Sequence, residues 1–203
     1  MQRANINFDR HMEEILSALK NKGQVPRVLL HACCAPCATS CIERLSGLCK
    51  LTVYFYNPNI DGEEEYELRK SELVRLCGVK GIQCITEEFN SQEFFSQISG
   101  LEQEKEGGAR CEKCFKLRLL KTAEIAKNES FDFFATTLTV SPKKNAVLVN
   151  DAGVFAEQLT GARYLATDFK KKNGFIRSVE ISNELNLYRQ NYCGCKFSKP
   201  KES

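Results

Sequence analysis

The stretch RVLLHACCAPC, residues 27–37, joins a short apolar run to three closely spaced cysteines. The apolar run at 27–32 predicts a buried strand, and Pro36 suits the first turn of a helix that should continue to about Gly47. A strand that leads directly into a helix is the repeating unit of parallel α/β sheets. Ligands of such sheets bind beyond the carboxyl ends of the strands, so this stretch predicts a fold and the position of a site.

The same alternation continues along the chain. Further strands are expected at 51–56, 81–86, 131–138 and 163–167. Helices are expected at 8–20, 63–76, 91–106, 114–127, 141–159 and 179–190, with Ser141-Pro142 as the N-cap and first residue of the fifth of these. This order predicts a single α/β domain over residues 1–203: a parallel sheet with helices on both faces, followed by a short basic tail after about residue 196.

The composition is that of an ordinary globular protein. Of the 203 residues 42% are hydrophobic and 27% charged, and the net charge of +3 favours no class of partner by itself. No apolar run approaches the ~20 residues that span a bilayer, and Met1–Arg10 lacks the apolar core of a secretory signal. We therefore expect a cytoplasmic protein without a membrane partner.

Seven of the eleven cysteines lie in three short motifs. The motifs are Cys33-Cys34-Ala35-Pro36-Cys37, Cys111-Glu112-Lys113-Cys114 and Cys193-Gly194-Cys195. Because disulfides are rare in a reducing cytosol, grouped cysteines there are more often metal ligands or redox thiols. Spacing alone leaves a structural zinc, a thiol–disulfide pair and an iron–sulfur cluster as alternatives. The remaining cysteines are expected in the core: Cys41, Cys49, Cys77 and Cys84.

Seven thiols exceed the four that a zinc ion or a 4Fe-4S cluster takes. The surplus is available for a second metal or for a catalytic thiol pair. The candidate ligands are Cys33, Cys34, Cys111, Cys114, Cys193 and Cys195, with Cys37 as a further ligand or a redox thiol. All three motifs fall at junctions between expected elements, and the first two immediately precede helices. We therefore expect them to meet at the carboxyl edge of the sheet.

Charged residues follow the later strands. Asp168 comes directly after the strand expected at 163–167 and is a candidate metal ligand, proton donor or turn cap. Lys143 and Lys144 at an expected helix start, and the run Lys170, Lys171 and Lys172, are either phosphate ligands or solvated side chains. Arg189 lies between aromatic residues in Tyr188–Tyr192, a pattern that suits RNA bases.

Taken together, these motifs resemble the cobalamin-independent epoxyqueuosine reductases, the QueH family. The resemblance runs from about residue 27 to 197 and rests on the cysteine motifs together with Thr136–Leu138, Ser141–Asn145, Asp168–Lys171 and Tyr188–Cys195. It implies reduction of the epoxide of epoxyqueuosine to the alkene of queuosine at the tRNA wobble position. It also implies a 4Fe-4S cluster and a sheet similar to that of adenine-nucleotide alpha-hydrolase-like (HUP/PP-loop) domains.

The implied chemistry constrains the cofactors. Removing an epoxide oxygen as water consumes two electrons and two protons, and a cluster usually passes one electron at a time. A second metal ion, iron, is therefore expected as a Lewis acid for the oxygen, with Asp168 and the surplus thiols as its ligands. The implied partners are tRNA and an unidentified electron donor. A zinc-stapled RNA-binding protein and a thiol–disulfide oxidoreductase remain the alternatives at this point.

Overall fold

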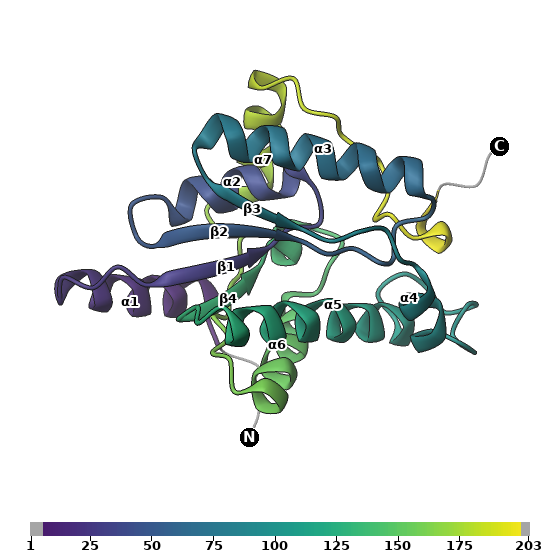
Figure 1. Ribbon diagram of the computed structural model, residues 1–203, viewed down its shortest axis with the longest axis horizontal. Coiled ribbons are helices and arrows are strands. Elements are labelled where there is room, and N and C mark those ends of the chain that lie inside the picture. Colours follow the sequence, from purple (N-terminus) through teal and green to yellow (C-terminus); the bar gives the residue numbers. More distant parts are fainter. Residues whose placement is uncertain (1–5, 200–203) are drawn as a thin grey trace.

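The computed structural model describes residues 6–199 and is built on one parallel sheet (Figure 1). The strands are β1 (Arg27–His31), β2 (Lys50–Phe55), β3 (Gln83–Thr86) and β4 (Phe133–Thr136), in the order β3-β2-β1-β4. The helices are α1 (Phe8–Asn21), α2 (Ala35–Leu45), α3 (Glu63–Lys80), α4 (Gln92–Gln97), α5 (Ala109–Asn128), α6 (Ala146–Thr160) and α7 (Gly174–Glu184), with 3-10 turns η1 (Thr137–Val140) and η2 (Lys196–Ser198).

Helices cover both faces of the sheet, as the sequence predicts. Val28 and Leu30 of β1 pack into a core shared with α1, α2 and α3, whereas Leu29 between them packs toward α5 and α6. Successive side chains of a strand point to opposite faces, so a central parallel strand covered on both sides is apolar throughout. Figure 1 shows α2, α3 and α7 on one side of the sheet and α5 and α6 on the other.

The expected fifth strand at 163–167 is wrong. Only Tyr164 pairs there, as an isolated bridge to Phe134 of β4. The backbone of Thr167 bonds instead to the side chain of Asn150, which accepts from its N–H at 3.1 Å and donates to its carbonyl at 2.9 Å. A side chain of α6 thus takes the hydrogen bonds that a strand would have used.

Three expected helices have other bounds. The helix expected at 91–106 is reduced to α4, because Gly100 has a φ of 81° and the carbonyls of Glu102 and Glu104 accept from the Arg110 guanidinium. The helix expected from Ser141-Pro142 begins only at Ala146, where Asn145 is the N-cap and accepts from the N–H of Val147 at 2.8 Å.

The last helix lies earlier than expected, at α7 rather than at 179–190. It begins at Gly174, where a Cβ would lie 1.8 Å from the carbonyl oxygen of Phe169, so only glycine fits. It ends before Asn186, which has a φ of 48°. Of the expected basic tail, η2 is described and the residues after 199 lie outside the described part. Within residues 6–199, no helix is both long enough and apolar enough to cross a membrane.

Candidate metal centre

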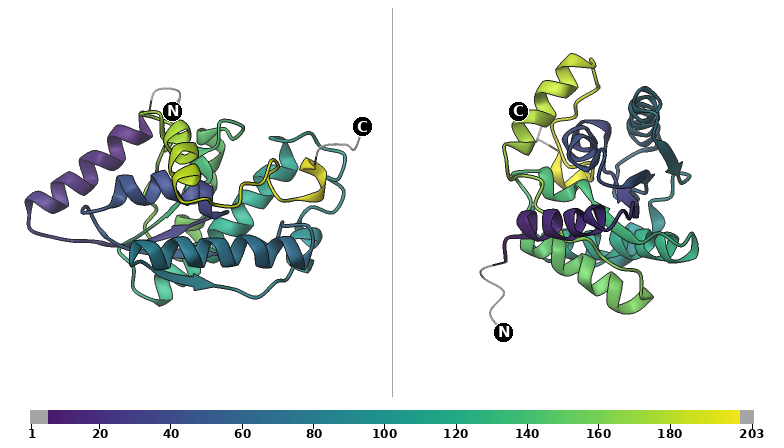
Figure 2. Two further views of the ribbon diagram at one scale, coloured as in Figure 1. Left: turned by 90° about the horizontal axis from the view of Figure 1, so that it is seen from above. Right: turned by 90° about the vertical axis from the view of Figure 1, so that its left-hand side faces the viewer.

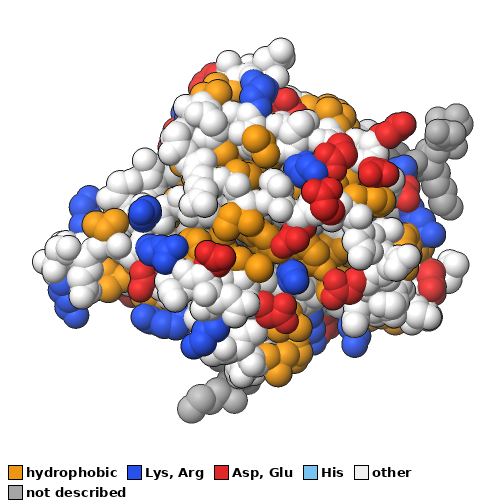
Figure 3. Space-filling view, viewed as in Figure 1, with side chains coloured by type: hydrophobic (Ala, Val, Ile, Leu, Met, Phe, Trp, Pro, Cys, Tyr) orange, Lys and Arg blue, Asp and Glu red, His pale blue; other side chains and the backbone are white. Residues whose placement is uncertain are grey.

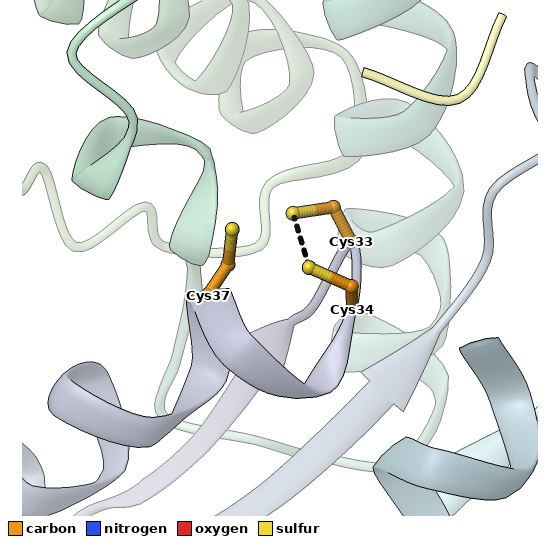
Figure 4. Close-up of side chains that lie close together, drawn as sticks. All are labelled: Cys33, Cys34 and Cys37. Atoms are coloured by element: carbon orange, nitrogen blue, oxygen red, sulfur yellow. Dashed lines mark hydrogen bonds between the residues drawn. The ribbon is translucent and has the colours of Figure 1, made fainter. Parts of the chain in front are cut away.

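The first cysteine motif forms a compact thiol group where β1 meets α2. The sulfur atoms of Cys33, Cys34 and Cys37 all lie within 4.8 Å of one another, and those of Cys33 and Cys34 are 3.9 Å apart. Figure 4 shows two side chains from the turn before α2 and one from its first turn, with their sulfurs converging. We call these three residues the inner group.

The sheet itself fixes the inner group. Thr137 follows β4, the neighbour of β1, and its hydroxyl accepts from the backbone N–H of Cys33 at 3.3 Å. His31 ends β1 and is fully buried, with its ring bonded to the Thr136 hydroxyl at 2.8 Å and to the Tyr56 carbonyl at 3.2 Å. Burial lowers the pKa of His31 to about 3, so its ring is neutral. His31 is thus a packed, hydrogen-bonded residue and not a free acid or base.

Cys111 and Cys114 lie inside the first turns of α5, not before the helix as the sequence suggested. The Gly107 N–H donates to the Cys111 sulfur at 3.2 Å, and the buried Arg118 guanidinium approaches the Cys114 sulfur at 3.9 Å. Burial raises the pKa of the Cys114 thiol to about 12, with Arg118 opposing that rise. Donors aimed at sulfur are typical of sites that stabilise bound thiolates.

Cys193 and Cys195 flank a bend that only glycine can make. Gly194 has a φ of 121°, and a Cβ there would lie 3.0 Å from the Arg69 guanidinium. The Gly194 carbonyl accepts from the N–H of Asp61 at 2.9 Å, and Arg69 donates to the Cys193 carbonyl at 3.3 Å. This loop, drawn in yellow, lies beside the start of α5 in Figures 1 and 2, where Cys195 and Cys114 share a small apolar cluster. We call Cys111, Cys114, Cys193 and Cys195 the outer group.

The structure brings all three motifs to one edge of the sheet, as the sequence predicts. Cys33, Cys37 and Cys193 line a cavity of about 230 Å³, here called the central cavity. A narrower adjoining cavity is lined by the whole outer group. Cys193 and Lys144 line both, so the inner and outer groups face a continuous space.

Positive charge surrounds these sulfurs. Hydrogen bonds with Cys34 and Cys37 hold the pKa of the Cys33 thiol well below its usual range, and Lys144 and Arg118 contribute to the same shift. Burial disfavours a charged Lys144, yet the thiols of Cys193 and Cys33 raise its pKa. Several buried thiolates would repel one another, and the positive charges of Lys144 and Arg118 offset that repulsion.

The donor set suits metal. All eleven cysteines are free, and the seven motif cysteines are buried or half-buried; six of them line the two cavities, and Cys34 lies behind Cys33. The other four pack in the core as expected: Cys41 and Cys77 are buried, and Cys49 and Cys84 pack against the same core. The inner group matches the spacing around a single ion, since two thiolates ~2.3 Å from one tetrahedral metal lie roughly 4 Å apart. The outer group supplies the four thiols that a 4Fe-4S cluster takes.

The structure does not bring Asp168 to the cysteines. It lines a separate cavity of about 500 Å³ on the far side of Lys144, where its carboxylate lies 3.4 Å from the ammonium of Lys170. The oxygen nearest to Lys170, Oδ1, is screened from solvent, and this ion pair is its interaction among the described residues, without a well-formed hydrogen bond. Lys144 lines both this cavity and the central cavity, so it lies between Asp168 and the cysteines.

The candidate tRNA ligands fall into two classes. Lys170 donates to the carbonyls of Thr139 and Lys144 at 3.2 and 3.1 Å, and Lys172 pairs with Glu13. The other candidates make no hydrogen bond or ion pair through the side chain within the described part of the chain: Lys143, Lys144, Lys171 and Arg189. Of these, Lys143, Lys144 and Arg189 line the central cavity.

Several residues of the central cavity were not among the candidates from sequence, and three of them carry groups suited to a ligand: Glu106, Phe175 and Gln190. Glu106 lies in a loop taken for helix, and Phe175 lies at the start of a helix that was expected later. Gln190 stands within a motif whose aromatics suggested base stacking. Those aromatics instead bind α3, because the Tyr188 hydroxyl donates to Glu65 at 3.0 Å and the Tyr192 ring lies 4.9 Å from the Arg69 guanidinium.

Comparison with known proteins agrees with this arrangement. A sequence model of the epoxyqueuosine reductase QueH family matches residues 28–201, which include all three cysteine motifs. The chain belongs to the QueH family. It is 41% identical to epoxyqueuosine reductase QueH of Streptococcus pyogenes serotype M1 over 95% of this chain and 78% of that protein. It is 38% identical to the Staphylococcus epidermidis QueH over 100% of this chain and 88% of that protein.

A solved structure supports the fold. The chain resembles the U34-tRNA thiolase NcsA from Methanococcus maripaludis, a structure described with its [4Fe-4S] cluster, at a TM-score of 0.55 and 14% identity. The match covers 95% of this chain and 69% of NcsA. The chain thus shares a parallel α/β fold with NcsA, in agreement with the fold class that the sequence predicts.

Proposed function

We propose that this protein is an epoxyqueuosine reductase that converts the epoxide of epoxyqueuosine, at the wobble position of tRNA, to queuosine. The observation that carries the proposal is the convergence of three cysteine motifs on one cavity, in a chain of the QueH family. The oxidoreductase class follows from that family. The substrate places the enzyme in the cytoplasm with tRNA.

The two cysteine groups are assigned different metals. Cys111, Cys114, Cys193 and Cys195 of the outer group would hold a 4Fe-4S cluster, because they supply four thiols from two motifs with donors directed at two of the sulfurs. Cys33, Cys34 and Cys37 of the inner group would hold a single iron ion, because their sulfurs are spaced for one centre. When bound, the cluster supplies electrons singly and the single ion is a Lewis acid.

The reaction balances as an epoxide plus two electrons and two protons, giving an alkene and one water. The electrons come from an external donor that is still unidentified. The central cavity holds the substrate against the inner group. Lys144 places a positive charge between the two groups, where negative charge develops on the departing oxygen.

We propose that Asp168 serves proton delivery rather than the second metal, because it lines a different cavity from the inner group. Its screened carboxylate oxygen lies in the cavity beyond Lys144, and Lys144 lines that cavity too. From this position Asp168 would pass a proton to the central cavity through Lys144 or a water molecule.

The tRNA is proposed to dock over the rim of the central cavity. Lys143 and Arg189 lie at that rim, and Lys171 lies on the adjoining surface; these side chains are free to meet phosphates. Lys144 is buried beside the cysteines and Lys170 and Lys172 already have partners, so their part in docking is secondary. The face drawn in Figure 3 carries acidic and basic side chains interspersed, in keeping with the small net charge. We therefore place docking at the local positive charge of the cavity rim.

The direct test uses protein purified without oxygen, a chemical reductant, and an anticodon stem-loop carrying epoxyqueuosine. We expect the nucleoside to lose one oxygen atom, as measured by mass spectrometry after digestion, and the protein to show broad visible absorbance with bound iron. A colourless protein containing zinc would favour a zinc-stapled RNA-binding protein. Activity that survives complete metal removal would favour a thiol–disulfide oxidoreductase. Either result would refute the proposal.

A further inference from the structure

The segment Tyr188–Tyr192 is a strap that closes one side of the central cavity. Both ends are fixed to α3: Tyr188 bonds to Glu65, and Tyr192 packs on Arg69. The three residues between them, Arg189, Gln190 and Asn191, line the cavity. The strap therefore presents its middle to the cavity while its aromatic ends are used for attachment.

An aromatic platform stands beside the strap. Phe175, at the start of α7, lines the cavity and is 38% exposed. The Arg189 guanidinium lies 6.0 Å from the centre of its ring. An exposed aromatic ring with an arginine near it is the usual surface on which a single unstacked base is held.

Unsatisfied acceptors line the same space. The Gln190 side-chain oxygen is screened from solvent and has no hydrogen-bond partner within residues 6–199. A buried acceptor without a donor is uncommon in a folded protein and indicates a missing ligand group. The carboxylate of Glu106 lines both this cavity and the neighbouring one, beside the cysteines.

The cavity volume limits the ligand. About 230 Å³ corresponds to roughly eight water molecules at ~30 Å³ each. That volume is on the scale of one heteroaromatic base with its substituent. Its inner wall is made by Cys33, Cys37 and Cys193, so a substituent on the base would reach the thiols.

We propose that the central cavity binds the 7-deazaguanine base of the wobble nucleotide, splayed out of the anticodon loop and stacked on Phe175. Gln190 accepts a hydrogen bond from an N–H of the Watson–Crick edge. The C7 substituent lies on the opposite side of the ring and points toward the cysteines. Glu106 pairs with the secondary ammonium that links the base to the epoxide ring. This inference rests on the proposed function, because that function defines the base.

The test measures binding without turnover. Three anticodon stem-loops, with queuosine, guanosine or an abasic site at the wobble position, are titrated against anaerobic holoprotein by fluorescence anisotropy. We expect the parent to prefer them in that order. Phe175→Ala should weaken queuosine binding about tenfold, and Gln190→Leu about fivefold, while both leave binding of the abasic stem-loop unchanged. Glu106→Gln should remove the preference for queuosine over guanosine.

Matched controls exclude a general effect on structure. Ile176→Ala changes the next residue of α7, which is 56% exposed and does not line the cavity, and Gln158→Leu changes an exposed glutamine of α6. Both should bind all three stem-loops as the parent does. Phe175→Ala and Gln190→Leu should also keep parental iron content and kcat, with only KM for the epoxyqueuosine stem-loop raised.

Failure of this inference is distinguishable from failure of the proposed function. If the protein reduces epoxyqueuosine but both cavity variants keep the parental preference for queuosine over the abasic loop, the base subsite is refuted and the reductase stands. A raised KM for the reductant alone would assign the cavity to the electron donor and also refute the subsite. If reduction is absent but the preference exists and is lost in the variants, the subsite stands without the reductase.

Discussion

The inner and outer cysteine groups are built in opposite ways. The inner group comes from one short stretch, and the ends of two paired strands place it. The outer group joins the start of α5 to a loop near the end of the chain, and long side chains hold these segments together. Thus the sheet determines one group, while tertiary contacts far from any motif determine the other.

Buried arginines make the outer group possible. Arg69 binds the Cys193 carbonyl and Glu65, and Arg110 collects three carbonyls of the loop before α5 while its guanidinium lies 4.5 Å from the Phe197 ring. Arg118 connects Cys114 to Asn57 after β2. Fixed cations near thiolates also offset the charge that four thiolates would bring. We therefore expect substitutions that remove metal from the outer group to leave the metal of the inner group in place.

Serine substitutions should separate the two groups most strongly. Cys114→Ser or Cys195→Ser should remove the visible absorbance, most of the iron and all turnover, because a cluster loses a required thiolate. Cys37→Ser should keep the absorbance, lose about one iron per chain and also abolish turnover. Metal analysis and absorbance of anaerobic protein measure the difference.

The control for these variants is Cys49→Ser, which changes a half-buried core cysteine outside all three motifs. It should retain parental iron and turnover. If Cys37→Ser and Cys114→Ser lose identical amounts of iron and absorbance, the two groups form one centre and the assignment is wrong.

Asp168→Asn should have the next largest effect on turnover. The substitution keeps the shape of the side chain and removes its charge, so the variant should fold, retain parental iron and lose most of its reductase activity. Single-turnover measurements with the epoxyqueuosine stem-loop test this. Parental turnover would leave Asp168 as the partner of Lys170 and no more.

The contrast between the groups also explains what sequence could predict. The inner group was predictable because strand, turn and helix start follow one another in RVLLHACCAPC, and local rules apply to such a stretch. The outer cysteines were recognisable by their spacing. Their supports were not, since Arg69 lies in a helix with no motif and bonds to a carbonyl far along the chain, and Arg110, although it precedes Cys111, bonds to loop carbonyls that no spacing rule marks.

The fold errors have the same origin. The strand expected at 163–167 failed because the Asn150 side chain bonds to both backbone groups of Thr167. The helix expected at 91–106 ends before Gly100, and the Glu102 and Glu104 carbonyls beyond it bond to the Arg110 side chain. In both places a side chain replaces the backbone partner that local propensity assumes. Such replacements depend on the folded arrangement and leave no periodic signal.

Arg69→Met should weaken the outer group selectively. The arginine is 1% exposed, and its loss leaves Glu65 unpaired and the Cys193 loop untethered. Breaking a largely buried pair costs about 3 kcal/mol of the free energy of unfolding. We expect that loss in urea denaturation, a lower cluster content, and an unchanged metal content of the inner group.

The comparison variant is Arg10→Met, which removes a pair with Glu14 on the exposed face of α1. An exposed pair of this kind adds little, so neither stability nor iron should change measurably. Equal effects of the two variants would mean that Arg69 does not position the outer group.

The smallest effects are expected at the lysines, and they test how tRNA reaches the two groups. Lys143 and Lys171 have no side-chain partner within residues 6–199, so each is free to neutralise a phosphate. Lys143→Gln or Lys171→Gln should lower affinity for any tRNA and reduce the slope of log affinity against log salt by about one.

Lys170→Gln should instead lower stability, because its ammonium already bonds to the carbonyls of Thr139 and Lys144. Lys22→Gln, at the far end of α1, is the control and should leave the salt slope unchanged. An unchanged slope in both Lys143→Gln and Lys171→Gln would move the tRNA away from the cavity rim, and the route to the inner group would have to be sought on another face.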